Sequence, residues 1–189
     1  MPGTRPAFCY DIGMRRLSIF FILLVAIAAF WIGSRYVVWQ RFQNSALPFY
    51  FRYPPGWIEE DLRTGDLDKV ILVRLHSKRN KRISMQVTNK TVADRPTDEA
   101  VLQETEESLR RNFPVFVMID RITIKVQNTD VPFLHFRYKT LDMQEDIEQY
   151  LGLLWNKETV YYVITQASPD EFKEHAPTFQ RLIGSIGFR

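Results

Sequence analysis

The sequence is poor in the residue types that build most reactive sites. It holds one cysteine, Cys9, and three histidines among 189 residues. A single cysteine excludes an intrachain disulfide and a cysteine-based metal site. The histidines His76, His135 and His175 form neither a His-x-x-x-His nor a His-Glu-x-x-His pattern, so the usual sequence signal for zinc is absent.

Glycine is also scarce, and its eight residues form no phosphate-binding loop. The segment Gly184–Gly187 lacks the Gly-x-Ser-x-Gly spacing of a nucleophile elbow. The acidic stretches Glu59–Asp68 and Asp142–Asp146 lack the alternating spacing and central glycine of a calcium loop. We therefore expect no catalytic residue, no cofactor and no metal site, and we predict that the protein is not an enzyme. A hydrolase or metalloenzyme would require these acidic stretches to converge with His76 or His135.

The excess of positive charge is confined to the N-terminal region. The net charge is +3, and four of the 25 basic residues but only one of the 22 acidic residues precede residue 41. The remaining 21 basic and 21 acidic residues make the rest of the chain neutral. Binding to nucleic acid requires an excess of cations that neutralise phosphates, so no nucleic-acid partner is expected.

A long apolar run, Leu17–Gly33, contains neither charge nor proline over seventeen residues. As a helix it spans about 26 Å, close to the roughly 30 Å of a bilayer core. We predict a disordered cytoplasmic tail over 1–13, a transmembrane anchor over 14–39 and a linker over 40–46. Arg15 and Arg16 precede the run, so the positive-inside rule keeps the N-terminus in the cytoplasm. The domain is then expected on the periplasmic side of the inner (plasma) membrane, anchored by a single span.

An alternative is a signal peptide that is cleaved after Ala26-Ile27-Ala28. The apolar run continues past that position into Phe30–Ile32, which favours the uncleaved anchor. Both interpretations place the following domain outside the cytoplasm. Whether the natural start is Met1 or Met14 stays open.

The predicted anchor carries two further patterns. Ala26, Ala29 and Gly33 share one helical face, where small residues allow a second transmembrane helix to approach closely. The alternative is that such residues are simply common in membrane helices. The residues expected at the membrane interface are aromatic or basic: Trp31, Arg35, Tyr36 and Trp39.

From Leu47 onward the hydrophobic pattern indicates strands and two helices. Residues 49–53 alternate with period two, as in a half-buried strand. Further strands are expected at 69–75, 82–88, 115–126, 131–140, 147–155 and 159–167. Helices are expected after Thr97 and Ser168, with Pro177 causing a kink or a restart in the second. This order predicts an α+β domain with a central, mostly antiparallel sheet and helices on both faces.

Two short motifs resemble the PsbP-like family. They are FRYPPGW at 51–57 and FQRLIGSIGF at 179–188, and the resemblance covers about 47–189. The residues that carry it are Tyr53, Pro54, Gly56, Trp57, Phe179, Ser185 and Phe188. The resemblance implies an α/β/α sandwich and a binding or assembly module without a shared catalytic residue. Members of that family include photosystem II subunits, envelope lipoproteins and a Ran-binding import factor.

The densest basic patch is a candidate surface for an acidic partner or for lipid headgroups. Its members are Arg74, Lys78, Arg79, Lys81 and Arg82. The alternative is a solvated hairpin tip. We therefore predict a membrane-anchored, non-catalytic accessory or assembly subunit of an integral membrane protein complex, photosynthetic or respiratory. The second hypothesis is a stand-alone envelope domain that binds a small ligand in an apolar pocket or serves envelope stress.

Overall fold

The computed structural model describes residues 25, 38–60, 62, 71–92, 95–139 and 145–189. The chain divides into two units, residues 1–38 and 39–189, and the fold described below is that of the second. The predicted cytoplasmic tail and nearly all of the predicted anchor lie outside the described residues. Within the described part of the chain, no helix is long and apolar enough to cross a membrane.

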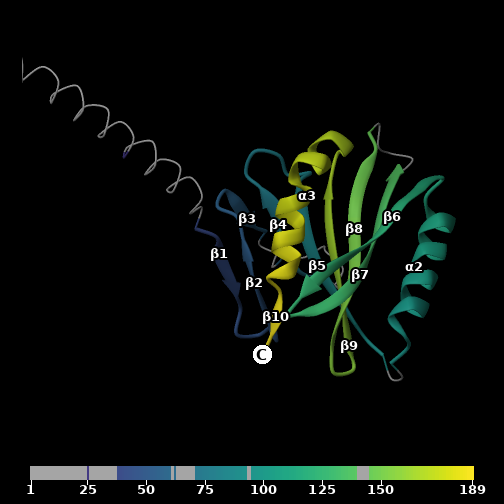
Figure 1. Cartoon of the computed structure of the whole chain (residues 1–189), viewed down its shortest axis with the longest axis horizontal. Coiled ribbons are helices and arrows are strands. Elements are labelled where there is room, and N and C mark those ends of the chain that lie inside the picture. Colours follow the sequence, from purple (N-terminus) through teal and green to yellow (C-terminus); the bar gives the residue numbers. More distant parts are fainter. Residues whose placement is uncertain (1–24, 26–37, 61, 63–70, 93–94, 140–144) are drawn as a thin grey trace, which may run out of the picture. The chain divides into compact units, whose positions relative to one another are not determined.

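The described residues of the second unit form ten strands and two helices (Figure 1). In chain order they are β1 (Gln40–Gln43), β2 (Phe49–Tyr53), β3 (Trp57–Glu59), β4 (Ile71–Ser77), β5 (Ser84–Thr91), α2 (Asp98–Asn112), β6 (Val115–Val126), β7 (Thr129–Lys139), β8 (Ile147–Asn156), β9 (Thr159–Ala167), α3 (Pro169–Gly184) and β10 (Gly187–Phe188). The expected mixed architecture with a central antiparallel sheet is confirmed.

The central sheet has seven strands in the order β3-β4-β5-β9-β8-β7-β6, and every neighbouring pair is antiparallel. Short turns connect β6 to β7 and β8 to β9, with positive φ angles at Asn128 and Lys157. β3 forms the edge of this sheet, because Trp57–Glu59 pair with Leu75–Ser77 of β4, and its last residue, Glu59, is the first of the acidic stretch Glu59–Asp68.

A second sheet of three strands, β1-β2-β10, packs beside α3. Here the predicted linker over 40–46 differs from the structure, since Gln40–Gln43 pair with Tyr50–Tyr53 as strand β1. The physical reason is aromatic packing: the ring of Phe42 stacks on Phe51 with centroids 4.7 Å apart. β10 pairs with the other side of β2 and so closes the small sheet.

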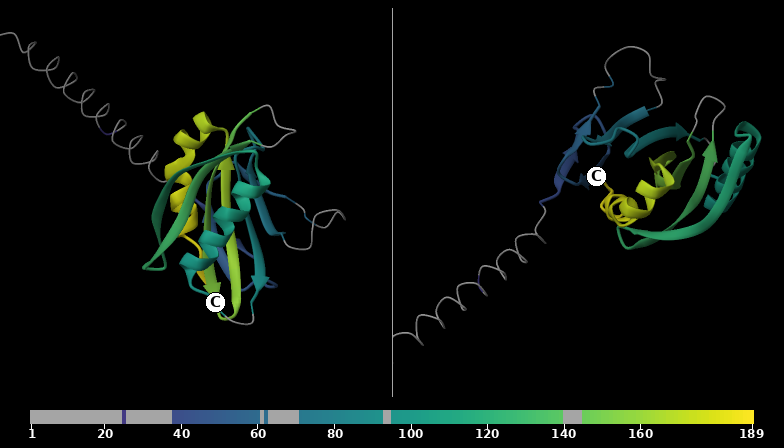
Figure 2. Two further views of the ribbon diagram at one scale, coloured as in Figure 1. Left: turned by 90° about the vertical axis from the view of Figure 1, so that its right-hand side faces the viewer. Right: turned by 90° about the horizontal axis from the view of Figure 1, so that it is seen from above.

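The two helices cover opposite faces of the central sheet (Figure 2). The sheet curves around α3, and one core lies between the sheet, α3 and the small sheet. The second core lies under α2, which contacts β6, β7 and β8. α2 therefore lies over the part of this face that β6, β7 and β8 form.

Both helices begin where the sequence predicts. The hydroxyl of Thr97 accepts a hydrogen bond from the backbone N–H of Ala100 at 3.2 Å, which caps α2. α3 follows Ser168 and runs from Pro169 to Gly184 through Pro177, so the helix does not restart at this proline. Pro177 has no backbone N–H to donate to the carbonyl of Lys173, four residues earlier. Both residues are exposed, so water can bond to this carbonyl instead.

Candidate functional site

The predicted basic patch lies on the hairpin of β4 and β5. Arg74 is in β4, and the other four members occupy the turn before β5: Lys78, Arg79, Lys81 and Arg82. Arg74 and Lys81 line one cavity, whereas Lys78 and Arg79 are exposed at the turn. Arg82 forms an ion pair with Glu145. The structure thus brings two of the five predicted residues into one concave site.

That cavity, which we call the polar groove, has a volume of about 400 Å³. It lies on the α2 side of the central sheet, because Arg74 and His76 alternate with residues whose side chains fill the core beneath α3. Its lining includes Arg74, His76, Lys81, Ser84, Gln86 and Gln166, together with Glu60. The groove is therefore built mainly from the polar positions of β4, β5 and β9.

Hydrogen bonds orient the side chains of the polar groove. One guanidinium nitrogen of Arg74 lies 3.4 Å from a carboxylate oxygen of Glu60, and the other lies 3.2 Å from Oε1 of Gln86. Both contacts are at the long end of the hydrogen-bond range. Arginine can only donate, so the Gln86 oxygen must be the acceptor, and the Gln86 amide nitrogen remains able to donate elsewhere.

A second glutamine pair lies beside the groove. The buried Gln149 donates from Nε2 to Oε1 of Gln166 at 2.7 Å and to the hydroxyl of Tyr138 at 3.2 Å. Burial raises the pKa of the Tyr138 phenol, which keeps it neutral and available for hydrogen bonding. This network gives the groove a fixed floor of polar groups.

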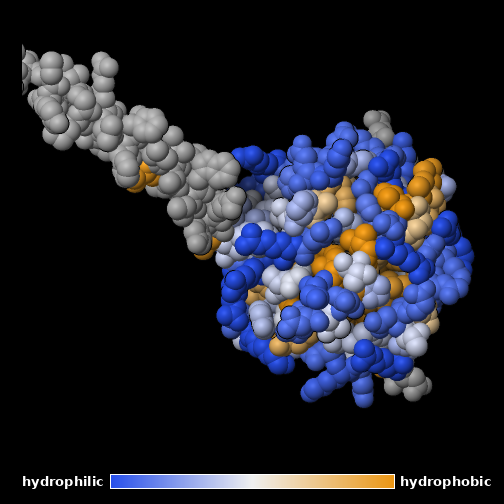
Figure 3. Space-filling view, viewed as in Figure 1, coloured by the Kyte–Doolittle hydropathy of each residue, from blue (hydrophilic) through white to orange (hydrophobic). Residues whose placement is uncertain are grey.

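A different surface lies at the far edge of the central sheet, on β6. Three β-branched side chains are exposed there: Val115 (51%), Val117 (53%) and Ile119 (43%). Phe116, which lies between Val115 and Val117, packs in the core under α2. Because side chains alternate along a strand, Val115 and Val117 face the other side of the sheet, the α3 side. On the neighbouring strand β7 they lie opposite Lys139 and Arg137. We call Val115, Val117 and Ile119 the β6 surface. Figure 3 shows hydrophobic area along β6.

β6 is an edge strand, so its outer backbone groups have no strand partner among the described residues. A β-bulge at Ile119 shifts the register with β7 and divides the edge into two regular stretches, Val115–Met118 and Asp120–Val126. Natural proteins usually protect such an edge with charges or a covering element, so an exposed apolar edge marks a site for another polypeptide.

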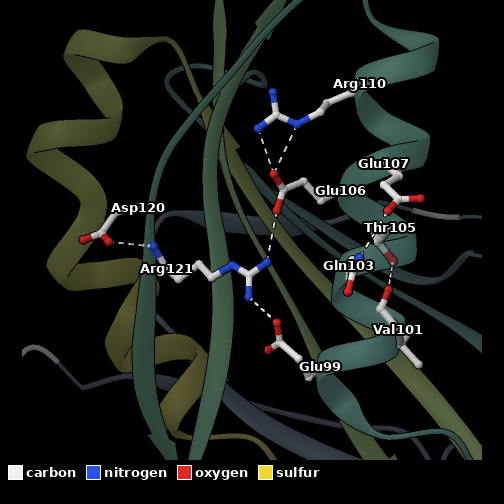
Figure 4. A network of polar contacts seen from close by, with 9 residues as sticks. All are labelled: Glu99, Val101, Gln103, Thr105, Glu106, Glu107, Arg110, Asp120 and Arg121. Atoms are coloured by element: carbon white, nitrogen blue, oxygen red, sulfur yellow. Dashed lines mark hydrogen bonds and ion pairs between the residues drawn. The ribbon is translucent and has the colours of Figure 1, made fainter.

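Ion pairs hold β6 against α2 (Figure 4). The guanidinium of Arg121 lies 2.6 Å from Glu99 and 3.1 Å from Glu106, and Glu106 also accepts from Arg110 at 2.8 Å. These hydrogen bonds, led by the one from Arg110, lower the pKa of the Glu106 carboxyl. The network fixes the edge strand without covering the β6 surface.

His135 lies in the interior beneath α3. Its Nε2 is 2.8 Å from Glu148, and its ring stacks on Phe172 with centroids 5.3 Å apart. Arg137 donates to the other oxygen of Glu148 at 2.8 Å. Glu148 itself is buried. These contacts give His135, Arg137 and Glu148 a structural role in the packing of α3 on the sheet. Across the described residues, no three His, Cys, Asp or Glu side chains converge as metal ligands.

The membrane-interface residues are placed only in part. Ala26, Ala29, Gly33, Trp31, Arg35 and Tyr36 lie outside the described residues, and the proposal for them is unchanged. Trp39 is described, and it packs against the domain core with the guanidinium of Arg181 4.4 Å from its ring centroid. In the second unit, Trp39 therefore has a role in packing that the sequence pattern did not indicate.

The motif residues have structural roles in the second unit. Gly56 adopts a φ of +83°, which favours glycine, in the turn that follows Tyr53 and Pro54. Trp57 meets Phe179 edge to face with centroids 6.2 Å apart. Two further members join the ends of the domain: Ser185 bonds to the backbone of β2, and Phe188 packs on Tyr161. The motif therefore links β2, β3, α3 and β10.

Sequence reasoning missed the β6 surface and most of the polar groove. The alternation at 115–126 predicts a strand, but only the sheet order shows that this strand is an edge. Gln149 and Gln166 are 17 residues apart on different strands, and no local spacing brings them together. The paired register of β8 and β9 does so.

Neither a model of a protein family nor a curated protein sequence matches this chain. Solved structures do match. Cyanobacterial PsbP (CyanoP) from Synechocystis sp. PCC 6803 has a TM-score of 0.59 and 14% identity, with 81% of this chain and 94% of that chain covered. The Ran-binding protein Mog1p from Saccharomyces cerevisiae has a TM-score of 0.56 and 12% identity, with 80% and 96% covered.

A third similar structure is LpqN, a protein involved in cell envelope biogenesis of Mycobacterium tuberculosis. Its TM-score is 0.50 and its identity is 13%, with 80% of this chain and 92% of that chain covered. At these identities the likeness concerns the fold. The chain therefore adopts the PsbP-like fold, as the motifs at 51–57 and 179–188 predicted.

Proposed function

We propose that this protein is a membrane-anchored, non-catalytic accessory or assembly subunit of an integral membrane protein complex. The observation that carries the proposal is the β6 surface, where Val115 and Val117 expose about half of their area beside an unpaired strand edge. Its occupant is an extended segment of a protein partner. Only a polypeptide strand can bond to the free backbone groups of β6 and also cover its apolar side chains.

The charge near this edge specifies the partner further. Lys139 lies opposite Val115 on the neighbouring strand and is half-buried, with no ion pair to a described residue. Arg137 lies opposite Val117. We therefore expect the docking segment to alternate apolar residues and to carry an acidic residue where it passes Lys139.

Location is part of the same proposal. The apolar run 17–33 and the basic residues before it support a single span, with the N-terminus in the cytoplasm and the domain in the periplasm. Ala26, Ala29 and Gly33 provide the face by which the span packs on a neighbouring helix of the complex. A photosynthetic or respiratory complex is the candidate partner.

The test is co-purification of the full chain from native membranes in mild detergent through a C-terminal tag. We expect a stoichiometric integral membrane complex with the unmodified protein, and its loss with Val117→Glu. Ile58→Glu is the matched control, because Ile58 is 40% exposed on β3, the opposite edge of the same sheet. Equal recovery of the complex with both variants would contradict docking through β6.

The anchor is tested separately. Replacing Ala29 and Gly33 with leucine should weaken co-purification if the small-residue face packs on the complex. Unchanged recovery would reject this packing and leave the β6 proposal intact.

The second hypothesis, a stand-alone ligand-binding domain, predicted an apolar pocket. Of two cavities lined by described residues, the polar groove has a lining that is part polar and part apolar, and a smaller one beside Arg41 and Tyr53 is largely polar. Recovery of the tagged protein without any stoichiometric partner from well-solubilised membranes would favour the stand-alone hypothesis.

A further inference from the structure

The polar groove occupies the part of the sheet face that α2 leaves open. α2 packs over β6, β7 and β8, and in the described part of the chain no helix covers β4 and β5 on that side. The side chains there are polar yet organised: Ser84 and Gln149 are buried, and Gln86 and Arg74 are joined by a hydrogen bond. A solvated sheet face requires no such network.

The groups that remain able to interact in the groove are mainly donors. The oxygens of Gln86 and Gln166 each already accept one hydrogen bond, from Arg74 and Gln149, whereas both amide nitrogens make no hydrogen bond to a described residue. Arg74 has five N–H donors, and its two contacts in the groove are long. Lys81 adds an ammonium group to the same lining.

The groove also carries a net positive charge. The lining contains two cationic side chains, Arg74 and Lys81, and one carboxylate, Glu60. Glu60 forms an ion pair with Arg74. Outside the groove, Lys78 and Arg79 are exposed on the adjacent turn and extend the positive field toward solvent. Such a field attracts anions to the groove.

We propose that the polar groove binds a phosphate-type oxyanion. A tetrahedral anion presents acceptor oxygens in several directions, so it can bond at once to Arg74 on β4, Lys81 in the turn and Gln86 on β5. A planar carboxylate has two oxygens and satisfies fewer of these groups. The volume of about 400 Å³ accommodates a phosphate ester as well as the free ion. This proposal does not depend on docking through β6.

The phosphate has two sources, a soluble phosphate or the headgroup of a phospholipid, and the experiment separates them. The full chain in an uncharged detergent is titrated calorimetrically with inorganic phosphate in one arm. In the other arm it is titrated with dihexanoyl phosphatidic acid, against dihexanoyl phosphatidylcholine. Acetate at the same ionic strength is the control for general anion effects.

There are two test variants: the single variant Lys81→Gln, and a double variant that combines Arg74→Gln with Lys81→Gln. The control is a double variant that combines Lys78→Gln with Arg79→Gln. The two double variants remove the same charge from the same hairpin, but only the first pair lines the groove. Lys81 is exposed in a turn, so the single variant leaves the fold intact.

We expect saturable binding in at least one arm, weakened about tenfold by Lys81→Gln and more by the double variant. The Lys78 and Arg79 control should change the affinity less than threefold. Saturation by inorganic phosphate identifies a soluble source, and saturation by phosphatidic acid alone identifies a headgroup. The proposal is overturned by the absence of saturation in both arms, by equal competition from acetate, or by equal losses in the two double variants.

Discussion

Nε2 of His135 on β7 lies 2.8 Å from Oε1 of Glu148 on β8, and Glu148 is among the few buried charged residues of the described chain. Its second oxygen accepts from Arg137. The carboxylate is therefore fully bonded inside the domain, and its neighbours His135 and Tyr150 pack on Phe172 of α3. The cluster joins the sheet to the first turn of the helix.

Glu148→Gln should lower the free energy of unfolding by about 2 kcal/mol, because two charge-assisted hydrogen bonds become weaker neutral ones. The measurement is urea unfolding followed by circular dichroism. Glu174→Gln is the control, since Glu174 is exposed on α3, and it should stay within about 0.5 kcal/mol of the unmodified protein. A Glu148 variant as stable as this control would show that the cluster does not stabilise the fold.

Gly152→Ala should destabilise the domain by about 2 kcal/mol through overpacking. Gly152 lies opposite Phe133 in the β7–β8 pair, and a Cβ at this position would overlap the Phe133 ring. The measurement is the midpoint of thermal unfolding. Phe133→Leu in the Gly152→Ala background should recover part of the loss, and failure to recover any would argue against this contact as the cause.

Ser185→Ala should cost about 1–2 kcal/mol of stability. Oγ of Ser185 accepts from the backbone N–H of Arg52 at 2.8 Å and lies 2.7 Å from the carbonyl oxygen of Leu182, to which it can donate. Removing the hydroxyl takes this partner from the backbone N–H of Arg52 on β2, whereas the Leu182 carbonyl keeps its hydrogen bond from the backbone N–H of Ser185. Ser45→Ala, at an exposed position, is the control in chemical unfolding, and similar losses in the two variants would contradict the prediction.

Glu106→Gln should reduce stability by about 1 kcal/mol at pH 7, because Glu106 pairs with Arg110 and Arg121. The pKa of Glu106 is lowered in the folded protein below its ordinary value of 4.5. The stabilisation is therefore fully present above pH 4.5 and is lost as the pH falls through the lowered pKa. Unfolding curves at pH 7 and at successively lower pH should show the two proteins converging, and a constant difference would contradict this assignment.

The sequence predicts the main strands and both helices because each carries its own local signal. Thr97 and Ser168 mark the helix starts, and alternating apolar residues mark the strands. β1 escaped prediction because its four residues contain a single apolar side chain, Phe42, whose strand conformation depends on stacking against a distant part of the chain.

The candidate surfaces are less predictable for a related reason. The basic residues of the β4–β5 hairpin can be read from the sequence. The sequence does not show that Lys81 lines the polar groove and that Lys78 and Arg79 do not, because this depends on the direction in which each side chain leaves the turn. Likewise, Val115 and Val117 alternate as buried strand residues would, but they are exposed at the edge of the sheet, where β6 is the last strand among the described residues. Such features arise from assembly of the sheet.

The position of β2 between β1 and β10 also determines when the domain can finish folding. β2 lies near the start of the domain and pairs with β1 on one side, yet on its other side Tyr50 and Phe49 pair with Gly187 and Phe188 at the end of the domain. A chain emerging from a ribosome or a translocation channel therefore keeps this edge open until nearly all of the domain has emerged. Closing so long a loop is entropically costly and slow. Chains that stop short of β10 would leave the backbone edge of β2 at Phe49 and Tyr50 without this strand partner, and such an open edge can pair with other chains.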